Sequence, residues 1–459
     1  MKSVALHNLG CKVNSYELDV IGQKLKEKGF SIVPFDEKAD IYMVNTCTVT
    51  NIADRKSRQM LHQAKKRNPE AVVVAIGCYV QTGGGQVLAD EAVDLVIGNN
   101  RKKDAVEILE EYLEKRGDKT AGGRSIADIG TEDVYEEMQL NYTTEHTRAY
   151  IKIQDGCNQF CSYCIIPYAR GRVRSRREED ILREVRGLAA QGFREIVLTG
   201  IHISSYGLDF DGIKNPEVGK PFPHERLLHL LRELDQVEEL ARIRLGSLEP
   251  RIITPAFAAG LKGIRKLCPH FHLSLQSGCD ETLARMNRHY TAGEYLEKVE
   301  LLRETFENPA ITTDVIVGFP GETDEEFERT KTFLEKVNFY EMHVFPYSRR
   351  EKTPAAARKD QVSESVKKER SRILLALAGK QSAAFRESYI GKEVCVLFEE
   401  TKEVCGVSCQ VGYTEEYIRA AKKTKENLSG KTAEGRLVGH IEGDLSSGGK
   451  ASDNIMWLE

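Results

Sequence analysis

Hydrophobic and polar positions alternate along the first third of the chain in a pattern that predicts strands separated by helices. Short apolar runs of strand character are bounded by segments with helical spacing of their apolar residues. The predicted strands cover Ser3–Leu9, Asp40–Thr46, Ala71–Ile76 and Val93–Ile97, and the helical segments between them include Ser15–Lys28 and Ala53–Lys66. Strands that alternate with helices favour a parallel sheet. We therefore predict an open parallel α/β domain over residues 1–116.

The same alternation resumes after residues 117–146, a stretch rich in Gly, Asp, Glu and Thr that we interpret as a linker. Six further strands are predicted at Ala149–Ile153, Glu195–Thr199, Arg242–Gly246, His270–Leu275, Thr312–Val317 and Glu341–Phe345. Helical periodicity is found at Arg177–Gln191, His224–Leu234, Asp280–Asn287, Ala292–Phe306, Asp324–Lys336 and Lys359–Phe385. This second α/β domain covers residues 147–385, and its functional side chains are expected at the carboxyl ends of the strands.

The last part of the chain changes to short strands separated by turns. These strands are predicted at Tyr389–Glu400, Glu403–Val411, Tyr417–Ala421 and Gly435–Ile441. Short strands at this spacing, without helices between them, are typical of a small all-β barrel. We place this barrel at residues 386–459.

Composition narrows the classes of protein that fit. The 459 residues suggest about three domains, and a hydrophobic fraction of 41% supports packed cores. No run of about 18 or more apolar residues occurs, and the start of the chain lacks the apolar stretch of a signal peptide. We therefore expect a cytoplasmic protein without a membrane partner, whose 11 cysteines are reduced and serve as ligands or buried thiols.

Three cysteines with the spacing C-x3-C-x2-C, Cys157, Cys161 and Cys164, directly follow the predicted strand Ala149–Ile153. A structural zinc site normally takes four protein ligands, whereas three cysteines can hold a [4Fe–4S] cluster and leave one iron free to bind a small molecule. No fourth cysteine or histidine lies nearby, and the second C-x2-C of a zinc ribbon does not occur. A reduced cysteine-rich loop is the alternative, but the strand-to-loop context favours a cluster.

Three predicted strands of the first domain are each followed closely by a cysteine, namely Cys11, Cys47 and Cys78. Ligands of an open α/β sheet bind outside the carboxyl ends of its strands, so these three thiols are expected to converge. Buried core thiols are the alternative, since free cysteine is often buried. Core thiols would lie within the strands, however, so we favour a second three-cysteine cluster.

The triplet Cys157–Cys164 is the core signature of the radical S-adenosylmethionine (SAM) enzymes. Together with the N-terminal cysteines it resembles the methylthiotransferases, which add a CH3–S group to tRNA or to a ribosomal protein. Leu9-Gly-Cys-Lys-Val-Asn-Ser-Tyr-Glu17 resembles the MtaB branch of this family, whereas the isopentenyl-adenosine branch usually reads Gly-Cys-Gln-Met-Asn here. Gln154-Asp-Gly-Cys-Asn and Cys164-Ile-Ile-Pro-Tyr-Ala-Arg-Gly171 are also similar to the MtaB branch. The run Thr82-Gly-Gly-Gly85 departs from the pattern, because a more ordered helix start is expected there.

The resemblance covers essentially the whole chain and implies a fold and cofactors. It implies a partial (β/α)6 TIM-like barrel in the centre and an RNA-binding TRAM barrel at the end. It also implies two [4Fe–4S] clusters, one on each cysteine triplet, and S-adenosyl-L-methionine. The residues expected to contact SAM are Tyr163, Gly200, Ser274, Gln276, Arg288, Ile316 and Gly318. A simple turn role is an equal alternative for Gly200, and a surface helix-end role is one for Arg288.

The implied reaction replaces hydrogen by a CH3–S group at C2 of N6-threonylcarbamoyladenosine, beside the anticodon (position 37) of tRNA. One SAM would methylate a sulfur held by the N-terminal cluster, and a second SAM would supply the radical that activates C2. We identify no general base. Isopentenyl-adenosine and a ribosomal-protein aspartate are alternative substrates. A two-cluster electron-transfer or redox-sensing RNA-binding protein is disfavoured, because it needs no SAM pocket, and the N-terminal cysteines disfavour a sulfur-free radical SAM methylase.

Local positive charge suggests where RNA binds, although the net charge of the chain is −4. Five arginines follow the cysteine triplet without an acid among them: Arg170, Arg172, Arg174, Arg176 and Arg177. A solvated arginine face is the alternative to phosphate contacts. Lys422 and Lys423 give the small barrel a basic edge, and Tyr413 and Tyr417 are candidates for stacking on bases. These residues are the predicted contacts to the tRNA anticodon stem-loop, and a one-electron reductant such as flavodoxin or ferredoxin is the other expected partner.

Overall fold

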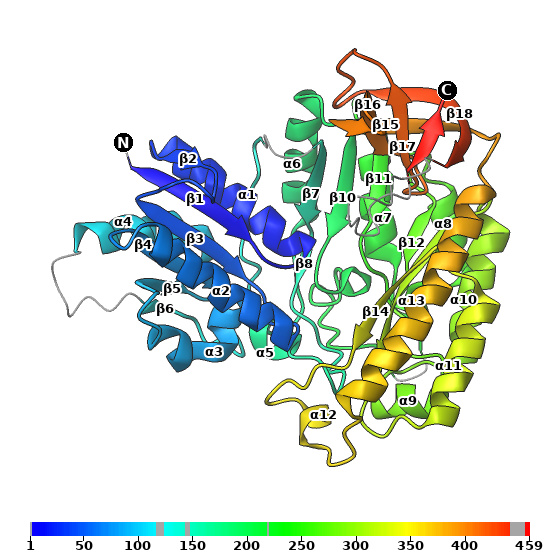
Figure 1. Cartoon of the computed structure of the whole chain (residues 1–459), viewed down its shortest axis with the longest axis horizontal. Helices are drawn as coiled ribbons and strands as arrows, with labels where there is room; N and C mark the ends of the chain where they lie inside the picture. Colours follow the sequence, from blue (N-terminus) through cyan, green and yellow to red (C-terminus); the bar gives the residue numbers. More distant parts are fainter. Residues whose placement is uncertain (1, 116–123, 143–146, 218–219, 441–454) are drawn as a thin grey trace.

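A computed structural model describes the chain except for residues 1, 116–123, 143–146, 218–219 and 441–454. Figure 1 shows an N-terminal α/β part in blue and cyan, a central part in green and yellow, and a small β-rich part in orange and red. The N-terminal part lies beside the central part, and the β-rich part lies at one end of the central part.

The N-terminal part is a parallel sheet covered by helices, as the alternation of the sequence predicts. Its strands are β1 (Ser3–Asn8), β2 (Ser31–Val33), β3 (Ile41–Thr46), β4 (Val72–Gly77), β5 (Leu95–Ile97) and β6 (Arg124–Ser125). Its helices are α1 (Lys12–Glu27), α2 (Asn51–Arg67), α3 (Cys78–Leu88) and α4 (Ala105–Glu114). The strand order is β2-β1-β3-β4-β5-β6, with all neighbours parallel. Strands β3 and β4 are buried along their whole length, which explains their nearly continuous apolar sequence.

Two strands of this sheet are not predicted by the sequence pattern. Strands β2 and β6 have three and two residues, which is too short for a recognisable periodicity. Strand β6 pairs with β5 and lies in the stretch interpreted as a linker, so part of that stretch belongs to the N-terminal sheet. The glycine run that departs from the family pattern lies inside α3, which is interrupted at Gly84 (φ +35°, ψ −102°).

The central part confirms the prediction of a partial (β/α)6 barrel. Its parallel strands are β7 (Arg148–Lys152), β10 (Glu195–Thr199), β11 (Arg242–Leu245), β12 (His270–His272), β13 (Ala310–Val317) and β14 (Glu341–Pro346). They form two sheets, β7-β10-β11 and β12-β13-β14, which the parallel bridges Ile243–Leu267 and Leu248–Leu273 join into one curved layer. A short antiparallel pair, β8 (Gln154–Asp155) and β9 (Arg174–Ser175), follows β7.

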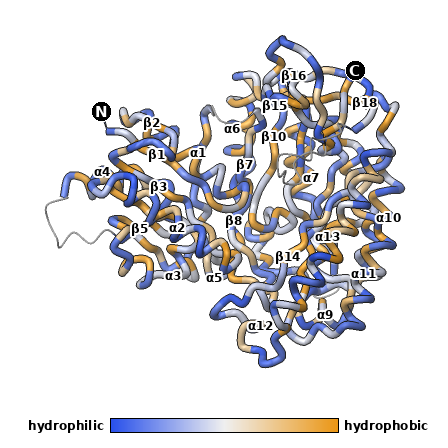
Figure 2. Tube along the Cα trace, viewed as in Figure 1, coloured by the Kyte–Doolittle hydropathy of each residue, from blue (hydrophilic) through white to orange (hydrophobic). Residues whose placement is uncertain are grey.

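The longer helices cover the outer face of this curved layer, namely α6 (Glu178–Ala190), α7 (Glu225–Asp235), α8 (Pro255–Lys262), α10 (Ala292–Thr305), α11 (Asp324–Val337) and α13 (Glu364–Glu387). The short α5 (Ile166–Arg170), α9 (Asp280–Arg285) and α12 (Pro354–Ala357) lie at the carboxyl ends of the strands, and α5 packs against α3. Capping boxes start α10 at Thr291 with Glu294 and α11 at Thr323 with Glu326. The long α13 packs along β14, and both α10 and α13 carry hydrophobic and hydrophilic positions in Figure 2.

The C-terminal part is a closed barrel, as the short strands predict. Its strands are β15 (Glu393–Val404), β16 (Val407–Tyr413), β17 (Arg419–Lys423), β18 (Thr432–His440) and β19 (Met456–Leu458), in the order β15-β16-β17-β19-β18. It packs against the end of the central part where the strands begin. Arg242 and Arg244 at the start of β11 donate hydrogen bonds to the carbonyl oxygens of Tyr413 (3.0 Å) and Glu415 (2.8 Å).

One hydrophobic core joins the N-terminal and central parts. Tyr16 and Ile21 of α1 belong to the same buried cluster as Ile151 of β7 and Val185 of α6. Helix α1 therefore lies between the two sheets. Its packing against both of them fixes the ends of their strands relative to each other. None of the helices in the described ranges is long and apolar enough to cross a membrane.

Candidate active site

The C-x3-C-x2-C triplet lies in a loop at the carboxyl end of β7, between β8 and α5. Gly156 precedes it with a φ of +71°, and a Cβ at this position would lie 1.8 Å from the carbonyl oxygen of Arg172, so only glycine fits. The N–H of Cys157 donates to the carbonyl oxygen of Gly171 (3.0 Å). The turn that carries the three thiols is thereby held against the segment that follows α5.

The thiols of this triplet are close enough to influence one another's ionisation. Burial, and then the neighbouring Cys161, raises the pKa of Cys157 to about 12. Burial, Cys161 and Cys157 likewise raise the pKa of Cys164. Free thiols of this kind stay protonated at neutral pH. A metal centre must therefore displace their protons when it binds.

Arg288, beyond the carboxyl end of β12, connects the triplet to the barrel strands. Its guanidinium donates to Sγ of Cys161 (3.3 Å), to the carbonyl oxygen of Ser274 (3.2 Å) and to the hydroxyl of Tyr290 (2.9 Å). The side chain is therefore not a free helix-end arginine on the surface. A guanidinium beside the thiols and a strand end is suited to pair with a ligand carboxylate.

The other residues predicted to contact SAM lie at the same end of the barrel. Gly200 directly follows β10, and Gly318 directly follows β13 with a φ of +68°. The N–H of Ile316 donates to the carbonyl oxygen of Gln276 (2.9 Å), which joins the ends of β12 and β13. Tyr163 and Ile316 pack against one hydrophobic cluster. These residues share the carboxyl-end side of the barrel, and their contacts with SAM stay a prediction.

Two buried polar side chains of this region are not indicated by the sequence pattern. Nε2 of His202 and Nη1 of Arg251 are buried without a hydrogen-bond partner in the described part of the chain. Burial, and then the cations Arg288 and Arg251, lowers the pKa of His202 to about 3, so its ring is neutral. A buried polar atom without a partner costs about 1–3 kcal/mol. A polar ligand such as SAM fits these atoms, and their only sequence signal is a position soon after a predicted strand.

The N-terminal triplet lies at the carboxyl ends of three neighbouring strands, as the sequence predicts. Cys11 follows β1 and precedes α1, Cys47 follows β3, and Cys78 follows β4 and begins α3. Burial raises the pKa of Cys47 to about 11, and the nearby Cys78 and Cys11 thiols act in the same direction. Asn99 donates to Sγ of Cys78 (3.5 Å). The three thiols therefore converge at one edge of the sheet.

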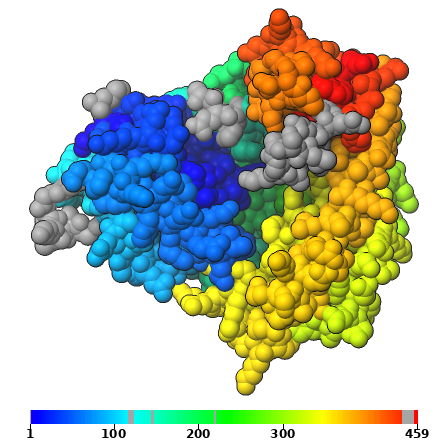
Figure 3. Space-filling view, in the orientation of Figure 1, coloured from blue at the N-terminus to red at the C-terminus, as the bar shows by residue number. Residues whose placement is uncertain are grey.

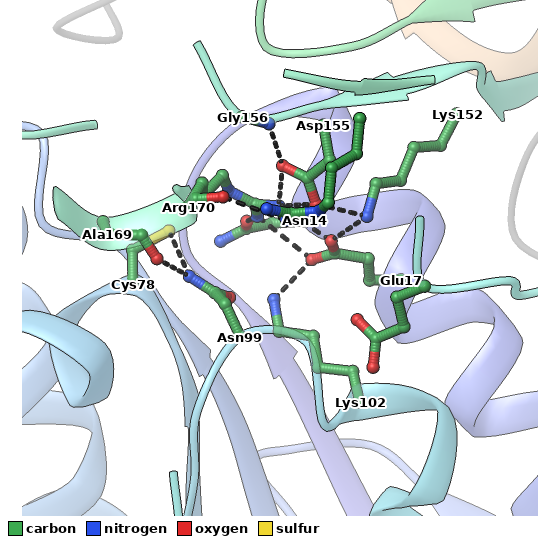
Figure 4. Close-up of polar contacts among 12 residues, drawn as sticks. Asn14, Glu17, Cys78, Asn99, Lys102, Lys152, Asp155, Gly156, Ala169 and Arg170 are labelled. Carbon is green, nitrogen blue, oxygen red and sulfur yellow. Dashed lines mark hydrogen bonds and ion pairs between the residues drawn. The ribbon is translucent and has the colours of Figure 1, made fainter. Parts of the chain in front are cut away.

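Buried charges lie at the boundary between the N-terminal and central parts, next to the segments that carry the two cysteine triplets (Figure 4). Five charged residues there are at most 4% exposed, namely Glu17, Lys102, Lys152, Asp155 and Arg170. Arg170 pairs with Glu17 (2.8 Å) and with Asp155 (3.0 Å). Lys152 pairs with the same two carboxylates at 2.8 and 2.6 Å, and Lys102 also pairs with Glu17. We call these five residues the interdomain charge cluster.

The cations of the interdomain charge cluster keep its carboxylates ionised. Burial acts to raise the pKa of Glu17, but Arg170, Lys102 and Lys152 together outweigh it and hold this pKa well below its usual range. Burial also opposes ionisation of Asp155, and Arg170 and Lys152 again lower its pKa. The cluster is therefore charged at neutral pH although it is buried.

Two amide side chains extend this cluster to the cysteines (Figure 4). Oδ1 of Asn14 accepts a hydrogen bond from Nη2 of Arg170 (2.6 Å) and lies 3.9 Å from Sγ of Cys11. Asn99, which contacts Cys78, also donates to the carbonyl oxygen of Ala169 in α5 (2.7 Å). The helix after one triplet thus contacts residues next to the other triplet.

Three arginines predicted to contact tRNA phosphates are buried, and that prediction is wrong for them. Arg170 and Arg174 are 1% exposed and Arg176 is 0% exposed. Arg176 pairs with Glu184 and with Glu137 (2.6 Å), and Arg174 donates to the carbonyl oxygen of Arg170 (3.0 Å). The local sequence contains no acids, but the fold brings partners from distant segments.

The other two arginines of this run are exposed. The guanidinium of Arg172 lies 4.4 Å from the ring centre of Phe160, and Arg177 pairs with Asp180 (2.9 Å). Both side chains are free to turn towards a polyanion, because exposed pairs of this kind contribute little to stability. Their contact with tRNA stays a prediction.

The tyrosines of the C-terminal barrel pack against the central part. The rings of Tyr413 and Tyr417 stack at 4.8 Å, and the Tyr417 hydroxyl accepts from Arg148 of β7 (2.6 Å). The guanidinium of Arg244 lies 4.4 Å and the ring of His270 lies 5.1 Å from the Tyr417 ring. Protein side chains lie against the ring of Tyr417 and disfavour base stacking there, whereas Tyr413 is only half-buried and its stacking on a base stays a prediction. Lys422 is half-buried, and Lys423 is exposed over the ring of Trp457 (4.5 Å).

A cavity of about 1470 Å³ lies between the N-terminal and central parts, beside the loop of the C-x3-C-x2-C triplet. Its lining includes Arg58 of α2, Tyr168 of α5, and Arg349 and Lys352 of the segment after β14, and all four side chains are exposed. A cationic surface with an exposed aromatic ring suits a polyanion such as RNA.

Sequence profiles of two families match the chain. The profile of the Radical SAM superfamily matches residues 151–334, and that of Uncharacterized protein family UPF0004 matches residues 3–98. These matches coincide with the central barrel and the N-terminal sheet.

Curated relatives match nearly the whole chain. A threonylcarbamoyladenosine tRNA methylthiotransferase MtaB of Bacillus subtilis is 40% identical over 440 residues, which cover 95% of this chain and 94% of the relative. The MtaB of Aquifex aeolicus is 41% identical over 420 residues, with 90% and 95% covered. A tRNA-2-methylthio-N(6)-dimethylallyladenosine synthase of Oceanobacillus iheyensis is 35% identical over 457 residues, with 98% and 80% covered.

A solved structure with a similar fold is the radical S-adenosylmethionine methyltransferase TsrM of Kitasatospora setae, with cobalamin and a [4Fe–4S] cluster bound. It superposes with a TM-score of 0.55 at 18% identity, and 77% of each chain is covered. At this identity the likeness concerns the fold alone.

Proposed function

The chain belongs to the MtaB type of the radical SAM methylthiotransferase family, and on this premise we propose that it methylthiolates a tRNA at C2 of N6-threonylcarbamoyladenosine beside the anticodon. Enzymes of this family transfer methylthio groups and use SAM and [4Fe–4S] clusters. The choice of substrate is supported by the names of the relatives that are 40% and 41% identical to this chain. Relatives named for dimethylallyladenosine are also similar, at 35% identity, so that base is the second candidate.

One observation carries the proposal: two cysteine triplets, each at the ends of parallel strands, lie on the two sides of the interdomain charge cluster. We assign one [4Fe–4S] cluster to Cys157, Cys161 and Cys164 and the other to Cys11, Cys47 and Cys78. When bound, SAM and the clusters supply the radical that activates C2 and the methylthio group that replaces its hydrogen. A protein that only transfers electrons would need a path for electrons between its two clusters, but it would not need a ligand pocket between them.

The protein's own residues contribute binding and orientation. Arg288 is placed to pair with the SAM carboxylate, and the unpartnered polar atoms of His202 and Arg251 are suited to its other polar groups. Asn14, Asn99 and Arg170 fix the two cysteine-bearing segments relative to each other. Reacting groups held in one geometry react faster, because the entropy of bringing them together is lost on binding rather than in the reaction.

Only the exposed arginines of the run after the cysteine triplet are available to contact tRNA. We propose that the anticodon stem-loop contacts the exposed Arg172, Arg177 and Lys423 and the cation-lined cavity beside the C-x3-C-x2-C loop. A one-electron reductant such as flavodoxin or ferredoxin and a cytoplasmic location complete the proposal.

The division of labour between the triplets is tested by iron and sulfide analysis after anaerobic reconstitution. The variant Cys11→Ala/Cys47→Ala/Cys78→Ala should fall from about eight to about four irons per chain, keep SAM cleavage and lose methylthiolation. The matched control, Cys279→Ala/Cys395→Ala/Cys405→Ala, should keep about eight irons. An iron content unaffected by the N-terminal substitutions would show that these thiols are structural.

A further inference from the structure

Three polar side chains meet on neighbouring strands inside the barrel. His272 of β12, Asp314 of β13 and His343 of β14 place a ligand atom each within 4.8 Å of one another. Nε2 of His272 lies 3.3 Å from Oδ2 of Asp314, and its Nδ1 lies 2.9 Å from the hydroxyl of Thr312. The two imidazole rings stack at 6.0 Å. We call His272, Asp314 and His343 the lumen triad.

The pleat of the strands directs the lumen triad towards the barrel interior. The neighbouring Phe271, Leu273 and Val315 are 0% exposed and belong to the hydrophobic core. Side chains alternate along a strand, so the triad faces the opposite side. There the side chain of Asp314 is 31% exposed and His343 is exposed. These polar groups are therefore accessible from the interior rather than sealed in the core.

The triad lies two residues nearer the start of its strands than the residues assigned to SAM. Ser274 follows His272 by two positions, and Ile316 follows Asp314 by two positions. Two residues along a strand span about 7 Å. On β14 the residue at this level is Phe345, whose side chain is 44% exposed and offers a ring face to a base. A purine stacked on the ring of Phe345 would point its exocyclic substituent towards the triad.

The exposed fractions of Asp314 and His343 show that solvent reaches the triad from the interior side. In Figure 3, green atoms of the central part are visible between the blue N-terminal part and the yellow elements. In the described ranges the ring of His343 has no hydrogen-bond partner, and its stacking on the ring of His272 leaves its nitrogen atoms available to a ligand. An exposed, unpartnered imidazole next to a histidine–carboxylate pair is typical of a binding site rather than of a core.

We propose that the lumen triad binds the threonylcarbamoyl group of the target adenosine, with the imidazole of His343 donating to its carboxylate and Asp314, oriented by its contact with His272, accepting from its hydroxyl or ureido N–H. The assignment rests on the proposed substrate and names the residues that select it. An isopentenyl group has no polar atom to offer. Placed here, it would cover His343 and leave that imidazole without a hydrogen-bond partner. A site built to hydrogen-bond a substrate strongly rejects an analogue that lacks the partner.

The test compares substrates on the reconstituted holoenzyme. Synthetic anticodon stem-loops carry threonylcarbamoyladenosine, isopentenyladenosine or unmodified adenosine, and kcat/KM for methylthiolation is measured with each. In His343→Phe and in Asp314→Asn, kcat/KM with threonylcarbamoyladenosine should fall about 10- to 100-fold, as expected when a polar partner of the bound substrate is removed. The ratio of kcat/KM between the two modified substrates should fall with it. Iron content and SAM affinity should stay at the wild-type values, and the surface change His62→Phe should alter none of these quantities.

The outcomes separate this inference from the proposed function. A wild-type enzyme that modifies isopentenyladenosine and not threonylcarbamoyladenosine would refute the substrate, and the inference with it. A wild-type preference for threonylcarbamoyladenosine that persists unchanged in both variants would overturn the inference alone. A preference that is lost in EDTA and restored by Mn²⁺, with the iron content unchanged, would also overturn it, because a bound cation would then contact the carboxylate.

Discussion

Replacing Glu17 by glutamine should loosen the contact between the N-terminal and central parts. Glu17 pairs with Lys102, Lys152 and Arg170, and the interdomain charge cluster holds three cations and two carboxylates, a net charge of +1. Glu17→Gln raises this buried net charge to +2. Removing one partner of a buried ion pair costs about 3–5 kcal/mol, because the remaining charge stays buried without compensation. This free energy corresponds to a roughly 100- to 4,000-fold increase in local opening.

The assay is native-state hydrogen exchange of the backbone amides of α1, read by mass spectrometry. Exchange reports local opening and does not require the whole chain to unfold in one step. The control Glu107→Gln, at an exposed position of α4, should change protection by less than about 0.5 kcal/mol. The double variant Glu17→Gln/Lys102→Met returns the net charge to +1 and should recover part of the protection. Protection of α1 in Glu17→Gln that matches the control would refute the argument.

Three further predictions concern the interdomain charge cluster, the SAM site and the tRNA surface. The pKa values of Glu17 and Asp155 are lowered in the folded state, so these carboxylates stabilise the fold fully above their unfolded pKa values of about 4 and lose this effect as the pH falls through the lower folded values. The urea concentration at the midpoint of unfolding should therefore be constant from pH 7 to 5 and fall in more acidic buffer. A steep loss already at pH 6 would contradict this. Arg288→Met should weaken equilibrium binding of SAM about 10- to 100-fold at unchanged iron content, since a charge-assisted hydrogen bond contributes about 1.5–3 kcal/mol. The SAM affinity of Arg288→Lys should lie between those of the wild type and Arg288→Met. An unchanged affinity in Arg288→Met would show that Arg288 does not contact SAM. Arg172→Glu and Lys423→Glu should each weaken tRNA binding and lower the slope of log affinity against log salt by about 1; a wild-type slope would exclude phosphate contact at that position.

The layout of the fold was predictable because long elements carry a clear period. The strands of the central barrel have a period of two with apolar outward positions, and helices such as α10 and α11 begin with capping residues that are recognisable in sequence. Strands β2 and β6 were not predictable, since three and two residues carry no period. The pairing of β6 with β5 depends on tertiary contact alone.

The cysteines were predictable as site residues, and the arginines were not. A cysteine directly after a strand occupies a known place in an α/β fold, so the sequence alone places Cys47 and Cys78 at the ligand-binding edge of the sheet. The charge run after the C-x3-C-x2-C loop is locally free of acids, and nothing in it indicates that Glu17 and Glu184 approach Arg170 and Arg176. The lumen triad was also missed. Its members lie on three separate strands, and no motif or spacing in the sequence links them to one another.

The most direct test of the central claim is product analysis with the reconstituted holoenzyme, SAM, a reductant and stem-loops that carry threonylcarbamoyladenosine, isopentenyladenosine or unmodified adenosine. Nucleosides and 5′-deoxyadenosine are quantified together by mass spectrometry. The account predicts 2-methylthio product from the threonylcarbamoyladenosine stem-loop, with deoxyadenosine formed alongside it, and little product from the other two. SAM cleavage without any methylthio product, or product from isopentenyladenosine alone, would contradict the account.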